Sequence, residues 1–303
     1  MNLRDLEYVV AVAEEGHFGR ASERCHVSQP ALSGQIKKLE DRLGVQLFER
    51  TNRRVAVTPI GAEVVEKAKR ALMIADEIED AAAAYSDPLA GPLRFGTIPT
   101  IGPFLLPAIL RPLKEALPKM QLTLREDVTQ ELERKLTSGE IDVAVTATDP
   151  KETGIEEVPL YDEPFCVALP VGHPLDTGKD LDVTTLSNTE LLLLKDGHCL
   201  SDQVARLCGL ARKSNVKGLD TQASSLETIV GLVAAGAGIT FLPASMVGEA
   251  GTLRPGITIR RATNEAASRR VRMIYRETFP KRALLAAMSA VILENLPEGV
   301  TPV

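Results

Sequence analysis

The stretch HVSQPALSGQIKKLEDRLGVQLFERTNRRVAVTPIG, residues 26–61, decides the fold of the N-terminal part of this chain. Ser28 is a good helix N-cap residue, and Pro30 falls in the first turn, where its missing N–H costs little. A single apolar stripe then follows at spacings of four, three and four residues, formed by Leu32, Ile36, Leu39 and Leu43. Gly44 ends the pattern. The stretch therefore predicts an amphipathic helix from Ser28 to Leu43.

Further elements are expected on both sides of this helix. Helical periodicity over 3–15 and a short helix over 20–25 precede it, separated by a break at residues 17–19. A β-ribbon with a turn at Thr51-Asn52 is expected over 46–49 and 54–58. Together these elements predict a winged helix-turn-helix over residues 1–58. On spacing alone, an ordinary amphipathic helix with a solvated polar face explains residues 28–43 better.

The charge of the whole chain is −6, which at first argues against a nucleic-acid partner. Phosphate contacts are local, however, so the charge of the ribbon matters more than the total. Residues 47–58 carry Arg50, Arg53 and Arg54 against the single acid Glu49. The ribbon is thus a basic patch on an acidic chain.

Residues 59–85 predict one long helix that begins at Pro59. Its small apolar residues recur at alternating spacings of four and three, namely Val64, Ala68, Ala71, Ala75, Ile78 and Ala82. Such a narrow seam needs a partner helix, so we interpret residues 59–90 as a dimerisation helix and hinge. A surface helix packed on its own C-terminal domain is the alternative. The composition of residues 86–92, SDPLAGP, favours a hinge.

From residue 91 to 303, expected strands and helices alternate. Strands are expected at 93–98, 122–126, 141–146, 165–169, 190–194, 239–242 and 272–275, and helices at 103–115, 130–137, 226–235 and 281–296. This alternation predicts an α/β fold with mostly parallel sheets, and the length favours two lobes. No run of about 18 apolar residues and no N-terminal signal segment occurs, so we expect a cytoplasmic protein without membrane spans.

Cys199 and Cys208 bracket a short apolar stripe in LLLLKDGHCLSDQVARLC, residues 191–208. A helix between them would hold them about 13 Å apart, whereas a disulfide needs Cα atoms within roughly 7 Å. We hypothesise that oxidation must unwind this helix. Helical N–H groups, His198 and a distant arginine could stabilise a Cys199 thiolate. Two inert buried cysteines remain an alternative. Metal binding through His198 and both cysteines would lack a fourth ligand.

The residues 11–61, beginning AVAEEGHFGRASERC, closely resemble the N-terminal module of LysR-type transcriptional regulators. The family pattern F-x-x-A-A-x-x-L-x-V-S-Q-P-A-x-S-x-Q-I-x-x-L-E-x-x-L-G-x-x-L-F-x-R is matched nearly throughout. Departures are Ser22 and Cys25, both compatible with packing. The resemblance implies a winged helix-turn-helix, a linker helix and a two-lobed α/β regulatory domain like periplasmic binding proteins. It implies DNA contacts by Ser28, Gln29, Pro30, Ser33, Gln35, Lys37, Arg50 and Arg53.

The segment DGHCLSDQ, residues 196–203, followed by Cys208, resembles the sensing loop of the hydrogen-peroxide sensors of this family. Residues 91–107 and 223–244 match their two lobes. The resemblance implies that Cys199 is the peroxidatic thiol and Cys208 the resolving one. It also implies a peroxide pocket with Thr100 and Thr129 on the peroxide oxygens, His198 and Asp202 framing it, Arg269 stabilising the thiolate and Glu227 holding Arg269. The loop 209–220 is expected to rearrange, and Cys25 and Cys166 to serve packing.

The partners that follow from this resemblance are double-stranded DNA, hydrogen peroxide, further copies of the chain in a dimer or tetramer, and RNA polymerase. No cofactor or metal is expected, and no enzymatic activity. A regulator of the same family that binds a small organic effector between the lobes is the nearest alternative. A thiol peroxidase would not need a DNA-reading module, and a solute-binding protein would not explain the N-terminal 86 residues.

Overall fold

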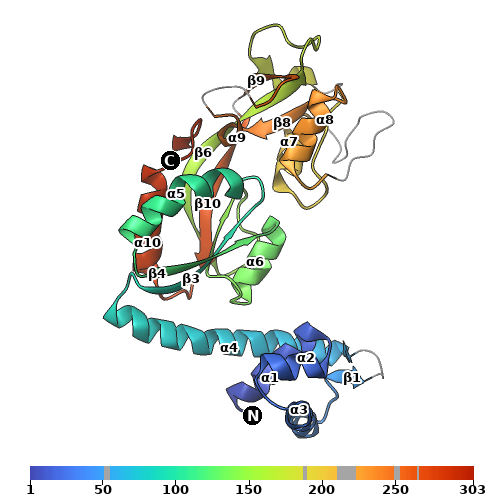
Figure 1. Cartoon of the computed structure of the whole chain (residues 1–303), viewed down its shortest axis with the longest axis vertical. Helices are drawn as coiled ribbons and strands as arrows, with labels where there is room; N and C mark the ends of the chain where they lie inside the picture. Colours follow the sequence, from blue (N-terminus) through green and yellow to red (C-terminus); the bar gives the residue numbers. More distant parts are fainter. Residues whose placement is uncertain (51–54, 187–189, 210–222, 249–252, 265) are drawn as a thin grey trace. The chain divides into compact units, whose positions relative to one another are not determined.

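The computed structural model describes residues 1–303 except 51–54, 187–189, 210–222, 249–252 and 265 (Figure 1). The described residues form two compact units, each with its own apolar core. Unit 1 comprises Met1–Ser86 and Thr137–Glu140, and unit 2 comprises Asp87–Leu136 and Ile141–Val303. No helix among these residues combines the length and apolarity that crossing a membrane requires.

Unit 1 is a helix-turn-helix with a two-stranded wing. Its elements are α1 (Leu3–Glu15), α2 (Phe18–Arg24), α3 (Gln29–Leu43), β1 (Phe48–Arg50), β2 (Val55–Val57) and α4 (Pro59–Ser86). The prediction for α3 is confirmed, because Ser28 Oγ accepts from the Ala31 amide at 3.4 Å and Gly44 ends the helix in the left-handed region, at φ 72°. The antiparallel β1–β2 pair confirms the ribbon, whose turn lies outside the described residues.

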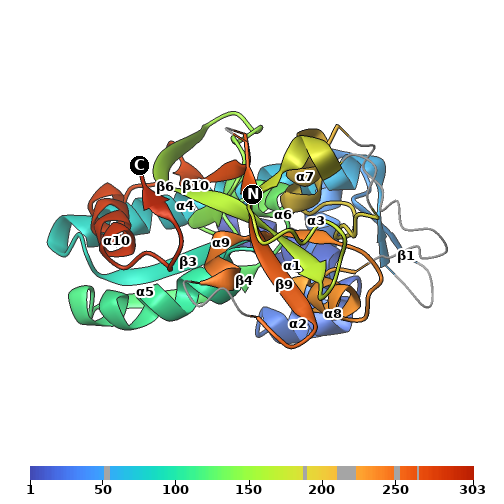
Figure 2. The same ribbon diagram turned by 90° about the horizontal axis from the view of Figure 1, so that it is seen from above.

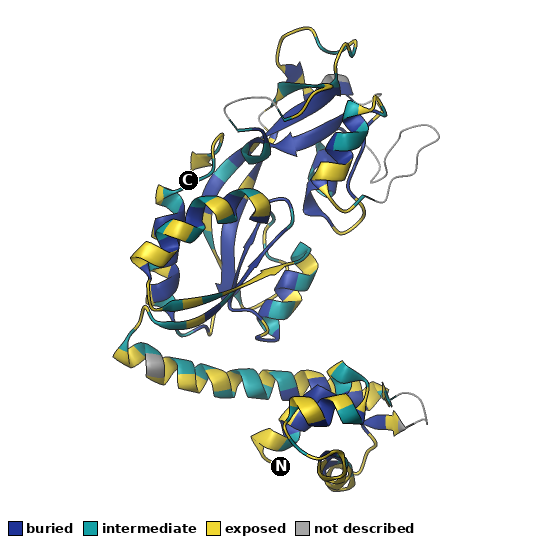
Figure 3. Ribbon diagram, in the orientation of Figure 1, coloured by how far each residue is buried: buried dark blue, intermediate teal, exposed yellow. Residues whose placement is uncertain are grey.

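Helix α2 starts two residues earlier than the sequence predicted. The expected break at residues 17–19 is in fact a helix cap, in which His17 Nδ1 accepts from the backbone amides of Gly19 and Arg20. The core beneath α2 and α3 is apolar, and it includes the fully buried Val9, Leu32 and Leu47. Leu32, Ile36 and Leu39 of the predicted stripe therefore face the core, whereas Leu43 at the end of α3 is exposed. The polar face of α3 lies outside (Figure 3).

Helix α4 is buried only in its first half. Ala68 packs with Leu6 and Val10 of α1, whereas Ile74 and Ile78 are 54% and 67% exposed. Figure 3 shows the second half of α4 alternating between intermediate and exposed residues. The predicted apolar seam is thus partly covered by α1 and partly open to solvent.

The first lobe of unit 2 begins as a parallel β/α arrangement. Its elements are β3 (Gly91–Thr97), α5 (Gly102–Ala116), β4 (Met120–Glu126), α6 (Thr129–Thr137) and β5 (Val143–Thr146). Strand β3 pairs in parallel with both β4 and β5. The C-terminal β10 (Ser268–Arg276) and α10 (Arg282–Glu294) return to this lobe, where α10 lies beside α5 (Figures 1 and 2).

The second lobe is built on the far half of one long strand, β6 (Ile155–Pro170). Its other elements are β7 (Leu181–Asp182), the 3₁₀ turn Val183–Leu186, α7 (Cys199–Leu207), α8 (Leu226–Ala234), β8 (Thr240–Pro243), α9 (Ala244–Val247) and β9 (Ile257–Thr263). The first half of β6 pairs with β10, and the second half pairs with β8 and β9. A short strand, β11 (Thr301–Pro302), also pairs with β6.

The expectation of mostly parallel sheets is wrong for this unit. The long sheet has the order β4-β3-β5-β10-β6-β9-β7, and β10 and β6 run antiparallel to their neighbours. The reason is that both strands cross between the lobes in opposite directions, which periodicity within one strand cannot reveal. The strand expected at 190–194 is reduced to a single bridge between Leu191 and Ile239.

Candidate functional site

Helix α7 places the two cysteines of interest at its opposite ends. Cys199 is its first residue after the cap His198, and Cys208 follows its last residue and donates its N–H to the Val204 carbonyl at 3.0 Å. Both are buried, with 9% and 5% exposure, and all four cysteines of the chain are free thiols. The structure thus confirms that a helix separates the pair.

A small pocket lies at the N-terminal end of α7. It leaves no room for a water-sized molecule in this structure, and it is lined by Ile98, Pro99, Thr100, Val128, Thr129, Gly197, His198 and Cys199. Thr100 follows β3 and Thr129 opens α6, so both come from the carboxyl ends of neighbouring strands. Four of the predicted site residues, Thr100, Thr129, His198 and Cys199, therefore meet here.

Two polar atoms of this pocket are poorly satisfied. His198 Nε2 is buried with no hydrogen-bond partner among the described residues, and the only interaction described for Thr129 Oγ1 is with the Cys199 thiol. Buried polar atoms are normally satisfied, so this pair suits a small hydrogen-bonding guest that enters when the lining side chains move apart. Organic ligands usually occupy pockets of about 300–1,000 Å³, which is larger than this one.

Arg269 is buried on β10 and contacts the pocket wall at Thr100. Its Nη1 donates to Thr100 Oγ1 and its Nη2 to the Thr100 carbonyl, both at 2.8 Å. The Thr100 hydroxyl thus accepts a hydrogen bond from Arg269, and Ile101, not Thr100, occupies the N-cap position of α5. The guanidinium supplies the fixed positive charge of the site.

The partner of Arg269 is Glu163, and the expectation that Glu227 holds it is wrong. Arg269 Nε and Nη2 lie 2.8 and 2.7 Å from Glu163 Oε2, and both side chains are fully buried. Glu227 instead lies exposed on α8, next to its N-cap Ser225. Sequence reasoning missed Glu163 because its only signal is its position across from Arg269 in the β6–β10 pair.

The surroundings act on the Cys199 thiol in opposite directions. The pKa of Cys199 is raised overall, because burial raises it by more than the Arg269 charge, the Thr129 hydroxyl and the Leu200 amide lower it. Burial also lowers the pKa of His198, so that ring is neutral near pH 7 and offers hydrogen bonds rather than charge. Arg269 is therefore the cation that favours the thiolate.

Asp202 is not part of the small pocket. Its charge raises the pKa of Cys199, and its side chain lines a second, larger cavity of about 790 Å³. That cavity is bounded by residues 147–151 after β5, by α7 and by the start of β10. The prediction that His198 and Asp202 frame one pocket thus holds for His198 alone.

Cys208 is a protonated, unreactive thiol in this structure. Burial raises its pKa to about 11. At pH 7 only about one molecule in 10⁴ would carry a thiolate there. The resolving role predicted for it therefore requires a change in its surroundings.

We expect iodoacetamide to alkylate Cys208 of the native reduced protein far more slowly than the same thiol in urea. Because the pKa is raised, the native rate should rise about tenfold per pH unit between pH 7 and 9. Peptide mass spectrometry after timed quenching measures this, with the half-buried Cys25 as the internal comparison. Equal native and denatured rates would contradict the buried, protonated state.

The outer face of α3 carries the predicted DNA-contacting side chains of unit 1. Ser33 is half-buried, while those on the open surface are Ser28, Gln29, Pro30, Gln35 and Lys37. Arg53 and the side chain of Arg50 lie outside the described residues. The arrangement is that of a recognition helix, with one apolar and one hydrogen-bonding face.

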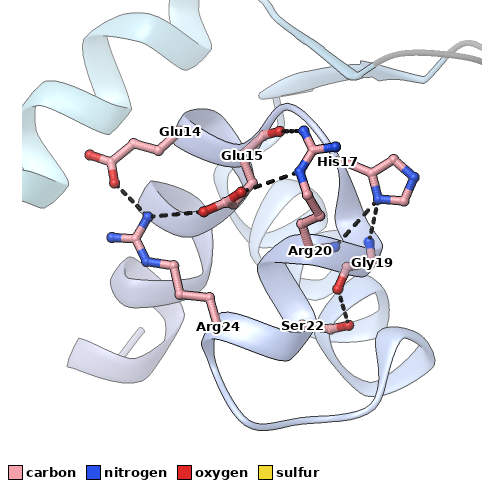
Figure 4. Close-up of polar contacts among 7 residues, drawn as sticks. All are labelled: Glu14, Glu15, His17, Gly19, Arg20, Ser22 and Arg24. Carbon is pink, nitrogen blue, oxygen red and sulfur yellow. Dashed lines mark hydrogen bonds and ion pairs between the residues drawn. The ribbon is translucent and has the colours of Figure 1, made fainter.

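A surface polar network ties α1 to α2 (Figure 4). Arg24 lies 2.7 Å from Glu14 and 3.6 Å from Glu15, and Arg20 Nε lies 3.3 Å from Glu15. Ser22, where the sequence departs from the family pattern, donates to the Gly19 carbonyl at 2.7 Å. The serine is therefore accommodated in the buried turn.

Replacing His17 with alanine should lower the free energy of unfolding of unit 1 by about 1 kcal/mol, because two amides at the start of α2 lose their cap. Urea denaturation followed by circular dichroism measures the change. Lys38→Ala, at an exposed position of α3, is the control and should change stability by less than about 0.5 kcal/mol. Equal effects of the two substitutions would contradict the capping role.

Comparisons with known proteins agree with this geometry. The model of the LysR substrate binding domain matches residues 86–297, and that of the bacterial regulatory helix-turn-helix proteins of the lysR family matches residues 3–62. The chain is 41% identical over 298 residues to the hydrogen peroxide-inducible genes activator of Dickeya chrysanthemi, covering 98% of this chain and 96% of the relative.

Two further similarities extend over nearly the whole chain. The DNA-binding transcriptional dual regulator OxyR of Escherichia coli K12 is 40% identical over 294 residues, which are 96% of this chain and 95% of that protein. The solved structure of full-length OxyR C199D from Pseudomonas aeruginosa superposes with a TM-score of 0.79 at 38% identity, covering 98% of this chain and 99% of that one.

Proposed function

The chain belongs to the LysR family of bacterial regulators, and from that membership we propose that it is a transcription regulator that senses hydrogen peroxide through Cys199. The observation that carries the proposal is the small pocket in which Cys199 meets Thr100, Thr129 and His198, with Arg269 behind it. Its relatives are named as hydrogen peroxide-inducible activators, which agrees with this reading.

The chemistry needs only the thiols of this chain and the peroxide. The Cys199 thiolate attacks one peroxide oxygen, the O–O bond breaks, and the leaving hydroxide takes up a proton to give water and Cys199 sulfenic acid. The Cys208 thiolate then attacks the Cys199 sulfur, forming the disulfide and releasing a second water after protonation. Thr129 Oγ1, beside the Cys199 thiol, and His198 Nε2, which has no partner among the described residues, would hold the peroxide oxygens.

The second step couples chemistry to shape. The helical rise over nine residues places the Cα atoms of Cys199 and Cys208 about 13 Å apart, so α7 must unwind before the disulfide can form. The reduced and oxidised regulatory domains therefore differ in structure, which makes a two-state switch. A cellular thiol reductant would return the disulfide to two thiols.

The output of the switch is DNA binding by the exposed face of α3, with Gln35 and Lys37 reading base edges or phosphates. One module contacts few bases, so a second copy of the chain is needed, joined through the exposed Ile74 and Ile78 of α4. Contact with RNA polymerase and a cytoplasmic location suit such a regulator. Because each disulfide stays on the protein, it acts as a switch rather than as an enzyme.

A count of free thiols tests the proposal. One equivalent of peroxide should lower the number of free thiols in the wild-type protein from four to two, because Cys199 and Cys208 are oxidised. Cys208→Ser should trap a sulfenic acid at Cys199, and Cys199→Ser should keep its three remaining thiols. A wild-type protein that keeps all four thiols would overturn the proposed function.

The larger cavity, of about 790 Å³, favours a second candidate function, a regulator that binds an organic effector, since its size suits a small metabolite. DNase footprints of reduced and oxidised protein on the same promoter separate the two functions. A footprint that changes with peroxide supports the redox switch. A footprint that ignores peroxide favours the organic effector.

A further inference from the structure

We propose that Glu163 is a positioning residue for the peroxide reaction, which fixes Arg269 beside the pocket and, as its permanent counter-ion, limits the positive charge left for the Cys199 thiolate. This inference rests on the proposed function, because it concerns the reactivity of the same thiol. It gives Glu163 two separable effects: its hydrogen bonds orient Arg269, and its charge sets how readily Cys199 ionises.

The register of two strands creates the pair. Glu163 on β6 and Arg269 on β10 are direct cross-strand partners, so their side chains rise on the same face of the sheet. Glu163 Oε2 accepts from Arg269 Nε and lies 2.7 Å from Nη2, so Nη1 is free to donate to Thr100 Oγ1. The carboxylate therefore aims the guanidinium at the wall of the peroxide pocket.

The carboxylate is itself fixed at its other end. Glu163 Oε1 accepts the backbone amide of Ser245, in α9, at 3.2 Å. Glu163 has no exposed surface, and the Arg269 side chain has none either. Neither side chain can turn away to solvent, so the distance from the guanidinium to the pocket is set by protein contacts alone.

The charges around Cys199 explain why the carboxylate matters. Arg269 on β10 is the cation that lowers the pKa of Cys199, while Asp202 on α7 raises it. Glu163 and the buried Tyr161, both on β6, face Arg269. Burial and the Lys195 charge both lower the pKa of His198, so this ring is neutral. The Arg269–Glu163 pair is neutral by itself, so Arg269, Glu163 and a Cys199 thiolate together carry a net negative charge.

A neutral residue in place of Glu163 would leave Arg269 as an uncompensated buried cation. The Cys199 thiolate is the pocket group that could then balance it, since the pKa of the buried Tyr161 is raised and its phenol stays neutral. Removing the negative charge while keeping an acceptor oxygen should therefore favour the thiolate. In the wild-type protein, the Glu163 charge therefore lowers the fraction of Cys199 that is ionised and able to react with peroxide.

The test compares the Cys199 pKa of wild type and Glu163→Gln in the reduced full-length protein. The ultraviolet absorbance of the thiolate is titrated against pH, and the same titration of Cys199→Ser is subtracted. We expect Glu163→Gln to lower the pKa by about one unit, and to raise the rate of sulfenic acid formation about tenfold below that pKa. Asp162→Asn, which removes the neighbouring exposed pair with Arg270, is the matched control and should change neither value.

Other outcomes decide against the inference. A folded Glu163→Gln protein with an unchanged or higher Cys199 pKa would show that the carboxylate only anchors Arg269. Glu163→Asp keeps the charge and should leave the Cys199 pKa near that of wild type, so a fall of about one unit in this variant would reject the charge effect, even if Glu163→Gln folds poorly. If wild type loses no thiols to peroxide, the proposed function fails, yet the titration still tests Glu163 by itself.

Discussion

Replacing Arg269 with alanine is expected to lower the free energy of unfolding by about 3–5 kcal/mol at pH 7, because it leaves a fully buried carboxylate unpaired. Glu163 would lose both hydrogen bonds from Arg269, and the Thr100 hydroxyl and carbonyl would each lose a donor. Urea denaturation of the reduced protein measures the loss. The same variant should react more slowly with peroxide, since the cation that favours the Cys199 thiolate is gone.

The loss of stability should depend on pH with a definite sign. An unpaired buried Glu163 would have a raised pKa in the folded state of the variant. The native state then binds a proton more tightly than the unfolded state, so stability falls as pH rises above the ordinary glutamate value of about 4.3. The difference between wild type and Arg269→Ala should accordingly be larger at pH 7 than at pH 5.

A double variant separates the stranded charge from lost packing. Arg269→Met combined with Glu163→Leu removes both charges and keeps most of the volume, so its stability should return to near that of wild type. Its Cys199 should nevertheless stay slow with peroxide. If the double variant is no more stable than Arg269→Ala, the buried carboxylate is not the cause of the loss.

Replacing Gly61 with alanine should destabilise unit 1 by about 2 kcal/mol or more, because the added methyl group has no room. A Cβ at this position would lie 2.1 Å from the Leu47 carbonyl oxygen, and that oxygen belongs to the backbone and cannot turn aside. The Leu47 carbonyl also accepts the Thr58 amide, which joins the wing to the start of α4. The substitution must therefore push α4 away from the wing.

Gly34→Ala is the matched control for that variant. Gly34 also lies within a helix, α3, but nothing stands within 4 Å of its added Cβ. Alanine is the better helix former, so this change should stabilise unit 1 by roughly 0.5–1 kcal/mol. Thermal unfolding of both variants gives shifts of opposite sign. A Gly61→Ala protein as stable as wild type would contradict the close packing of α4 on the wing.

The sequence by itself determined what is local. Ser28, the apolar stripe from Leu32 onward and Gly44 specify α3 completely, because a helix cap, a helix face and a helix stop all depend on neighbours within four residues. The same reasoning placed Cys199 and Cys208 at opposite ends of α7. The resemblance then brought Thr100, Thr129 and His198 to one pocket, where the structure also places them.

Only the tertiary structure decided the partner of Arg269 and the directions of the strands. Glu163 precedes Arg269 by 106 residues, and nothing in its local sequence distinguishes it from the exposed Glu227. Its role comes from the antiparallel register of β6 and β10, two strands that cross between the lobes. The pKa of Cys199 is decided the same way, since burial and the Arg269 charge both arise from residues brought together by folding. Short-range patterns fix helices and caps, whereas a buried charge and its counter-ion are fixed by how distant strands pair.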